Sequence, residues 1–141
     1  MKNIATILLL LIPIVIASTN NAKYVDVNDQ EITLMAKVVE TEAKGENFHG
    51  KYLVASTIIN RLKDNRFPSS VNKILFEPNQ YARPSIKYSE QSLLAVKHAI
   101  RDPYPNILYF YNPKKAKNKR FISRLSKCIM VGNHKFCSNF K

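Results

Sequence analysis

The sequence is poor in glycine, cysteine and histidine, and these shortages exclude several kinds of site. Three glycines do not form a phosphate-binding glycine-rich loop, and no Gly-x-Ser-x-Gly turn is present. A serine nucleophile on another framework stays open. The three histidines and two cysteines show no metal-ligand spacing. We therefore expect neither a metal nor a cofactor.

Acidic residues are absent from the last part of the chain. All ten lie between Asp26 and Asp102, whereas nine lysines and arginines follow Pro103, and the chain has a net charge of +12. Such a segment favours an anionic partner: nucleic acid, an acidic membrane, or a wall polymer with carboxylates and phosphates. The densest basic run, residues 114–120, is expected to be a solvated loop. It has no interleaved aromatic residue, which argues against stacking on single-stranded nucleic acid.

The longest apolar run lies at the N-terminus. Lys2, the apolar residues 4–16 and the small residues after them are typical of a secretory signal. We expect cleavage after Ala17, with Ala22 as the second choice, although an uncleaved anchor stays open. The predicted organisation is a signal peptide over 1–17, a flexible lead-in over 18–27 and a single domain over 28–141. Export counts against an intracellular nucleic-acid-binding protein.

Four helices are predicted from capping residues and apolar spacing. Asn28 with Glu31 forms a capping-box pattern that starts a helix ending near Gly45. A second helix is expected over 49–63, a short third one follows Ser70 through 75, and Ser89 opens a fourth. We expect outward side chains at Lys51, Arg61 and Lys63, and inward ones at Leu93, Leu94, Val96 and Ile100. The turn-rich segment 77–88 is expected to form one wall of a cleft.

Strand-like sequence follows, at residues 107–111 and around a turn at Gly132-Asn133. A two-residue loop there places Cys128 opposite Cys137, with Cα atoms about 4.5 Å apart. In an exported protein these cysteines should form a disulfide worth about 2 kcal/mol. The same alternation places four side chains on one face, which we expect to point inward: Ile129, Val131, His134 and Phe136. His134 is then either a core histidine or a residue that lines the cleft.

Glu42 is the residue best suited to catalysis in this pattern. On a helical wheel it lies at the edge of the apolar stripe, next to Met35 and Val39. A half-buried carboxyl loses hydration, and its pKa rises toward that of a general acid at the working pH. Spacing alone favours the simpler reading, a border glutamate that reaches solvent. Glu46 would share this side, whereas Glu40 points about 160° away.

Six segments, in order, extend over nearly the whole exported chain: residues 34–46, 50–61, 67–68, 80–81, 108–113 and 132–136. Together they resemble the motifs of the cell-wall hydrolase family of the SleB/CwlJ type, which includes spore-cortex-lytic enzymes. The resemblance implies an α+β, mainly helical fold, with a lysozyme- or lytic-transglycosylase-like lobe and a small C-terminal β-hairpin. It also implies cleavage of the bond between N-acetylmuramic acid and N-acetylglucosamine in peptidoglycan.

The resemblance assigns the catalytic role to Glu42 and a supporting role to Glu46. Five further residues are candidates for hydrogen bonds or stacking with sugars, and each also suits a purely structural role: Gln80, Tyr81, Tyr111, Asn112 and His134. The expected partners are peptidoglycan glycan strands and, through the basic C-terminal half, anionic cell-wall polymers. We expect a monomer that binds no nucleic acid.

Three classes of function remain open at this point. The first is a lytic transglycosylase that uses one glutamate as acid and then as base, or a muramidase that adds water and needs a second acid. The second is a non-catalytic peptidoglycan-binding module with the same fold. The third is a cationic membrane-active protein, which would need a free amphipathic basic helix, whereas the basic residues here gather in loops and the hairpin.

Overall fold

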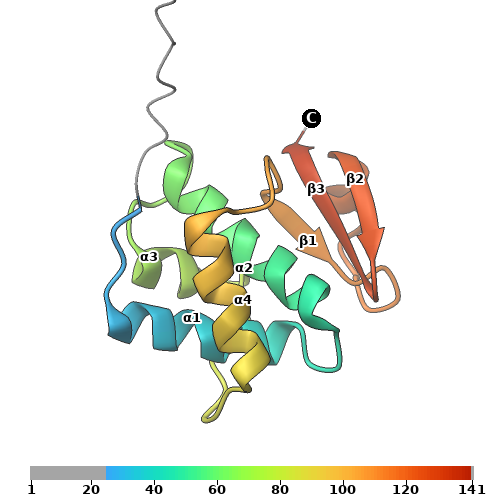
Figure 1. Cartoon of the computed structure of the whole chain (residues 1–141). Coiled ribbons are helices and arrows are strands. Elements are labelled where there is room, and N and C mark those ends of the chain that lie inside the picture. The colour runs from blue at the N-terminus through green and yellow to red at the C-terminus, as the bar shows by residue number, and fades with distance from the viewer. Residues whose placement is uncertain (1–24, 141) are drawn as a thin grey trace, which may run out of the picture.

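The computed structural model describes residues 25–140, so the predicted signal peptide and most of the lead-in lie outside the described residues. The elements run in the order α1 (Asp29–Glu42), α2 (Phe48–Lys63), α3 (Val71–Leu75), α4 (Glu90–Arg101), β1 (Tyr109–Tyr111), α5 (Lys119–Ser123), β2 (Leu125–Val131) and β3 (His134–Phe140). Helices α1 to α4 form one body, and the three strands form a small sheet beside it (Figure 1). The expected α+β, mainly helical fold is confirmed. Within residues 25–140, no helix is long and apolar enough to cross a membrane.

The helices begin where capping side chains occur. Asn28 accepts the Glu31 N–H at 2.9 Å, and the Glu31 side chain accepts the Asn28 N–H at 3.1 Å, which completes the predicted capping box. Ser70 and Ser89 cap α3 and α4, also as predicted. Helix α2 begins one residue earlier than expected because Asn47 caps it. Helix α1 ends at Glu42, and a turn follows it.

Helix α2 lies at the centre of the helical body and is buried along most of its length. The prediction that Lys51 and Arg61 point outward was wrong: they are only 5% and 4% exposed. Each charge finds internal partners, since Lys51 Nζ lies 3.1 Å from Ser92 Oγ and Arg61 Nε donates to the Leu108 carbonyl at 2.8 Å. Buried cations of this kind are tolerated because their hydrogen bonds replace water. Lys63 is half-buried.

Helix α4 packs through small side chains. Ser92, Ala95, Val96 and Ala99 are buried, whereas Leu94 is 48% exposed, so its predicted inward position was wrong. The small residues let α4 approach α2 closely, and Leu94 lies off this narrow buried stripe.

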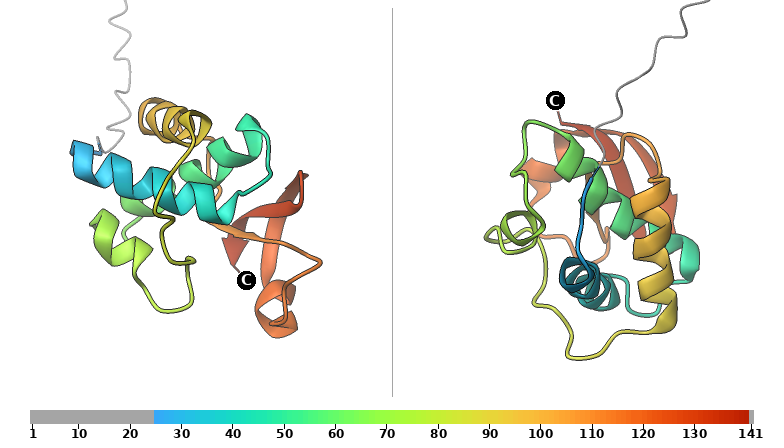
Figure 2. Two further views of the ribbon diagram at one scale, coloured as in Figure 1. Left: turned by 90° about the horizontal axis from the view of Figure 1, so that it is seen from below. Right: turned by 60° about the vertical axis from the view of Figure 1, so that its left-hand side comes forward.

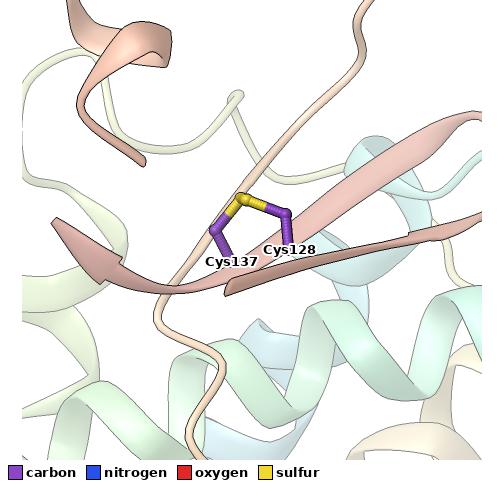
Figure 3. Close-up of a disulfide and its surroundings, with 2 residues drawn as sticks. All are labelled: Cys128 and Cys137. Carbon is purple, nitrogen blue, oxygen red and sulfur yellow. A yellow bond between two sulfur atoms is a disulfide. The ribbon is translucent and has the colours of Figure 1, made fainter. Parts of the chain in front are cut away.

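The sheet has the order β1-β3-β2, with antiparallel pairs throughout. The predicted hairpin register is confirmed, with Val131 opposite His134 and Cys128 opposite Cys137. The two cysteines form a disulfide with Cα atoms 4.0 Å apart (Figure 3). Because β3 is central and β2 is an edge strand, Phe136 is fully buried while its partner Ile129 is 37% exposed. The expectation that Ile129 points inward was therefore wrong.

Two details of the C-terminal half differ from the prediction. Strand β1 begins at Tyr109, and Ile107 and Leu108, which were predicted to be part of it, are buried ahead of it. The basic run is a loop only up to residue 118, where Asn118 caps the short helix α5 by accepting the Phe121 N–H at 3.0 Å.

The loop between α3 and α4 passes next to α1 (Figure 2). The Ser85 N–H donates to the Lys37 carbonyl at 3.2 Å, which fastens the middle of this loop to the helix. The loop therefore stands beside the C-terminal end of α1, where Glu42 lies.

Candidate active site

A cleft of about 490 Å³ opens where the end of α1, the start of the α3–α4 loop, the end of β1 and the hairpin tip meet. These segments are distant in the sequence and come together only in the folded chain. The residues that line the cleft are Thr41, Glu42, Lys44, Glu46, Gln80, Phe110, Tyr111, Asn112, Lys115, Asn133 and His134. Six of the seven site candidates from the sequence are among them.

Glu42 is the last residue of α1, and its side chain is half-buried in this cleft. Its Oε1 accepts the backbone N–H of Ala82. Burial raises the pKa of Glu42, and the Ala82 N–H and His134 offset this effect only in part. Glu42 therefore keeps its proton to a higher pH than an exposed glutamate does, as a general acid must.

Glu46 lies in the turn between α1 and α2, and its side chain is only 5% exposed. Its Oε1 accepts the Asn133 N–H at 3.0 Å and lies 3.3 Å from His134 Nδ1. Burial opposes ionisation, but the Asn133 N–H, the Asn133 side chain and His134 outweigh it, so the pKa of Glu46 lies below its ordinary value. The two cleft carboxyls are thus driven toward different protonation states.

Two of the three glycines make room for Glu46. A Cβ at Gly132 would overlap the Glu46 carboxylate, and one at Gly50 would lie 2.9 Å from Glu46 Cβ. Gly132 also has a φ of +56°, which side-chain-bearing residues rarely adopt. The hairpin turn therefore closes directly onto Glu46.

His134 opens β3 and lines the cleft, although it is only 9% exposed. Its ring packs against both Phe110 and Phe136, with centroid distances of 5.8 and 6.2 Å. The two readings left open by the sequence therefore hold together, because this histidine is packed among aromatic rings and still borders the cleft.

The other polar candidates occupy two sides of the cleft. Gln80 is exposed, and its Oε1 accepts from Arg61 Nη1 at 3.1 Å, which leaves its amide NH₂ available to a ligand. Asn112 Oδ1 accepts the Lys114 N–H at 2.9 Å and shapes the turn after β1. Tyr111 lies beside it on the strand.

Tyr81 is the one candidate that does not line the cleft. Its ring packs 5.2 Å from the Arg61 guanidinium and 6.0 Å from the Phe110 ring. Its hydroxyl is buried without a hydrogen-bond partner among the described residues, and burial raises the pKa of Tyr81 to about 12. The structure gives this residue a packing position behind the lining residues.

Several contributors were missed from the sequence. Arg61 holds Gln80 and lies close to the rings of Phe67, Tyr81 and Tyr109, but its spacing on α2 resembles that of a surface residue. The backbone N–H groups of Ala82 and Asn133 also contribute, but residue type does not reveal such a role because almost every residue has an N–H. The carboxyl partners are also 40 and 87 positions away.

A family model described as cell wall hydrolase matches residues 45–137. The chain belongs to the cell wall hydrolase family. The matched stretch contains six of the seven site candidates, and Glu42 lies just ahead of it.

Three relatives are spore cortex-lytic enzymes. Those of Oceanobacillus iheyensis and Bacillus cereus are each 33% identical over 117 residues, which is 78% of this chain and 42% and 45% of those proteins. The enzyme of Bacillus subtilis is 32% identical over 117 residues, which is 78% of this chain and 38% of that protein. The chain therefore spans less than half the length of these relatives.

Two solved structures share the fold. The catalytic domain of the Bacillus cereus SleB protein superposes with a TM-score of 0.72 at 31% identity, covering 79% of this chain and 92% of that one. The catalytic domain of the germination-specific lytic transglycosylase SleB from Bacillus anthracis gives 0.71 at 31% identity, covering 79% and 96%. The resemblance inferred from the sequence motifs is confirmed.

Proposed function

We propose that this chain cleaves peptidoglycan glycan strands between N-acetylmuramic acid and N-acetylglucosamine, with Glu42 as the single catalytic carboxyl. The observation that carries the proposal is the pair of cleft carboxyls. The pKa of the accessible one, Glu42, is raised, and the enclosed one, Glu46, is held as a carboxylate. The relatives named for lysis of the spore cortex support the same substrate class.

The reaction uses Glu42 twice. Protonated Glu42 donates to the glycosidic oxygen, the bond from that oxygen to muramyl C1 breaks, and positive charge develops at C1. The Glu42 carboxylate then accepts the proton of the muramyl 6-hydroxyl, whose oxygen bonds to C1. The products are a free 4-hydroxyl on the leaving sugar and a 1,6-anhydro-muramyl end. Glu42 recovers its proton and no water is consumed.

The position of Glu46 favours this route over hydrolysis with two carboxylates. A second catalytic carboxylate must reach either the sugar or a water beside it. Glu46 is 5% exposed, and the Asn133 N–H and His134 already contact its Oε1. We assign it the task of holding the hairpin tip against the end of α1. Gln80, Tyr111, Asn112 and His134 are the groups proposed to contact the sugars.

Three further parts of the proposal rest on the sequence. Residues 1–17 are proposed to direct export, residues 28–141 to form the single catalytic domain, and the basic C-terminal half to attract anionic wall polymers. The protein is proposed to act as a monomer without a cofactor.

The test is mass spectrometry of soluble fragments released from purified peptidoglycan. Wild type and Glu77→Gln, an exposed carboxyl outside the cleft, should both release anhydro-muramyl fragments. Glu42→Gln should lower the rate of fragment release about 10²-fold or more, because general acid–base catalysis accelerates reactions about 10²–10⁴-fold. Fragments with added water would show the hydrolytic route. Sedimentation with the wall but no fragments from any variant would identify a binding module.

A further inference from the structure

A second cleft continues the first along the end of α1. It has a volume of about 510 Å³ and is lined by Glu40, Thr41, Lys44, Ser85, Lys87, Tyr88 and Ser89. Thr41 and Lys44 line both clefts, so the two clefts adjoin at the end of α1, close to Glu42, and we call the pair the groove. The outer wall of the second cleft is the α3–α4 loop, which lies alongside α1 (Figure 2).

Three lysines line the groove, and its two ionised carboxylates, Glu40 and Glu46, are already engaged by other groups of the protein. Glu40, the carboxylate of the second cleft, is engaged by the protein itself: Ser89 Oγ and Ser89 N donate to it at 2.6 and 2.9 Å, Ser92 Oγ also donates, and Lys51 Nζ lies 3.4 Å away. Lys44 and Lys87 are exposed and form no ion pair within residues 25–140. In the first cleft, Lys115 adds a further cation.

The backbone around Lys87 is attached to α1 on both sides. Ser85 donates its N–H to the Lys37 carbonyl, and Ser89 binds Glu40. Only Ile86, Lys87 and Tyr88 stand between these two attachments. Tyr88 is 36% exposed and presents part of its ring beside the two lysines, as a surface for a sugar ring or an aliphatic arm.

We propose that Lys44 and Lys87 bind a carboxylate on the peptide-bearing arm of a muramyl unit next to the bond that is cleaved. This inference rests on the proposed function and adds a substrate feature to it. The sugar backbone of a glycan strand is neutral, so its fixed charges lie on the substituents. A lysine ammonium on a flexible stem suits a carboxylate whose position varies from unit to unit.

The experiment measures binding with catalysis removed. The Glu42→Gln chain is sedimented with untreated walls, with walls stripped of phosphate polymers by hydrofluoric acid, and with stripped walls whose carboxylates are amidated with a carbodiimide and ethanolamine. Lys44→Gln/Lys87→Gln is added to this background and should weaken binding to the stripped wall about three- to tenfold, since each exposed pair contributes modestly. On the amidated wall the two lysine changes should have no effect.

The matched control is Lys73→Gln/Lys97→Gln, which removes the same charge from exposed helix positions outside both clefts. Equal losses in the two double variants would overturn the proposal, because general attraction would then explain the binding. A loss that persists on the amidated wall would also overturn it. A loss seen only before phosphate is stripped would assign the lysines to wall phosphate instead.

The outcome stays separate from that of the proposed function. Equal fragment release by wild type from stripped and amidated walls, with equal binding, would overturn the carboxylate subsite and leave glycan cleavage standing. Binding that depends on Lys44, Lys87 and wall carboxylates, without fragments, would support the subsite and remove the catalytic proposal.

Discussion

Glu42 and Glu46 lie one helical turn apart in the sequence but meet different surroundings. Glu42 accepts one hydrogen bond, from the Ala82 N–H, and burial removes much of its hydration, so its pKa is raised. Glu46 gains the Asn133 N–H and the neighbouring His134, and its pKa is lowered. Burial that dominates at Glu42, and hydrogen bonds with a neighbouring histidine that dominate at Glu46, thus shift the pKa values of two identical side chains in opposite directions.

The pH dependence of the rate follows from the pKa of Glu42. The acid must be protonated, so fragment release should fall as pH rises through that pKa, which lies above the ordinary value of 4.5. His134 lowers the pKa of Glu42, and His134→Gln should therefore move this limb to higher pH. Initial rates across a pH series for both chains provide the measurement. If the rate fell at the same pH in both chains, the fall would not report the pKa of Glu42 as His134 shifts it.

Gly132 and Gly45 allow a paired test of the packing around Glu46. Gly132→Ala places a methyl group on the Glu46 carboxylate at a φ of +56°, and should cost about 1–3 kcal/mol of unfolding free energy and more than tenfold in rate. Gly45→Ala meets no atom within 4 Å, so only its φ of +82° opposes it. That variant should lose about 1 kcal/mol and keep its kcat.

Urea unfolding and fragment release on the two glycine variants supply the comparison. Equal loss of kcat in both would mean that backbone strain, and not contact with Glu46, limits the rate.

The α3–α4 loop is the element that joins both halves of the groove to the helical body. Ala82 contacts Glu42, Ser85 contacts Lys37, and Ser89 contacts Glu40. The Glu40 carboxylate fastens the end of this loop to α1, α2 and α4 together, through Ser89, Lys51 and Ser92. Although the sequence indicated that Glu40 is a poor catalyst, its anchoring role depends on hydroxyl groups that lie about fifty positions away.

Glu40→Gln tests this anchor through stability. Hydrogen bonds from Ser89 and Ser92 lower the pKa of Glu40 from 4.5 to about 2. The unfolded chain therefore binds the proton first, so the stabilisation is complete above about pH 4.5 and disappears as pH falls toward 2. We expect Glu40→Gln to lose about 2 kcal/mol at pH 7 and much less at pH 3. Urea unfolding at both pH values measures the difference, and an equal loss at both would contradict the anchor.

The hairpin couples the disulfide to the whole molecule. Phe136 joins the hydrophobic core, Asn133 and His134 reach the cleft, and the Cys128–Cys137 bond ties their strand to β2. Cys128→Ala/Cys137→Ala should lower the unfolding free energy by about 2–3 kcal/mol, as expected for a short closed loop. Thermal unfolding of the double variant, beside wild type treated with reductant, gives the measurement. Unchanged melting in both would contradict a stabilising role.

The parts of this fold that were predictable depend on neighbours in the sequence. The caps at Asn28, Ser70 and Ser89 are local, and the Gly132-Asn133 turn fixes the register that pairs Cys128 with Cys137. Family motifs then pointed to the cleft residues.

The predictions that were wrong concern residues whose surroundings are set by partners far along the chain. Arg61 is buried because Leu108 accepts its hydrogen bond 47 positions away, and Ile129 is exposed because β2 has no outer neighbour in the sheet. Periodicity cannot report either fact. The same holds for the lysines of the second cleft, whose meeting requires the α3–α4 loop to lie against α1.

The separation of the contacts around Glu46 also bears on the order in which the chain folds. Asn133 and Glu46 are 87 positions apart, so their hydrogen bond closes one of the longest loops available to the described chain. Long loops are closed late, after local helices have formed. A refolding chain should thus regain helical signal well before it regains the proposed glycan cleavage. Under the proposed function, recovered activity would report the last step of folding, and a newly made chain would stay inactive until its C-terminal hairpin had reached Glu46 in the turn after the first helix.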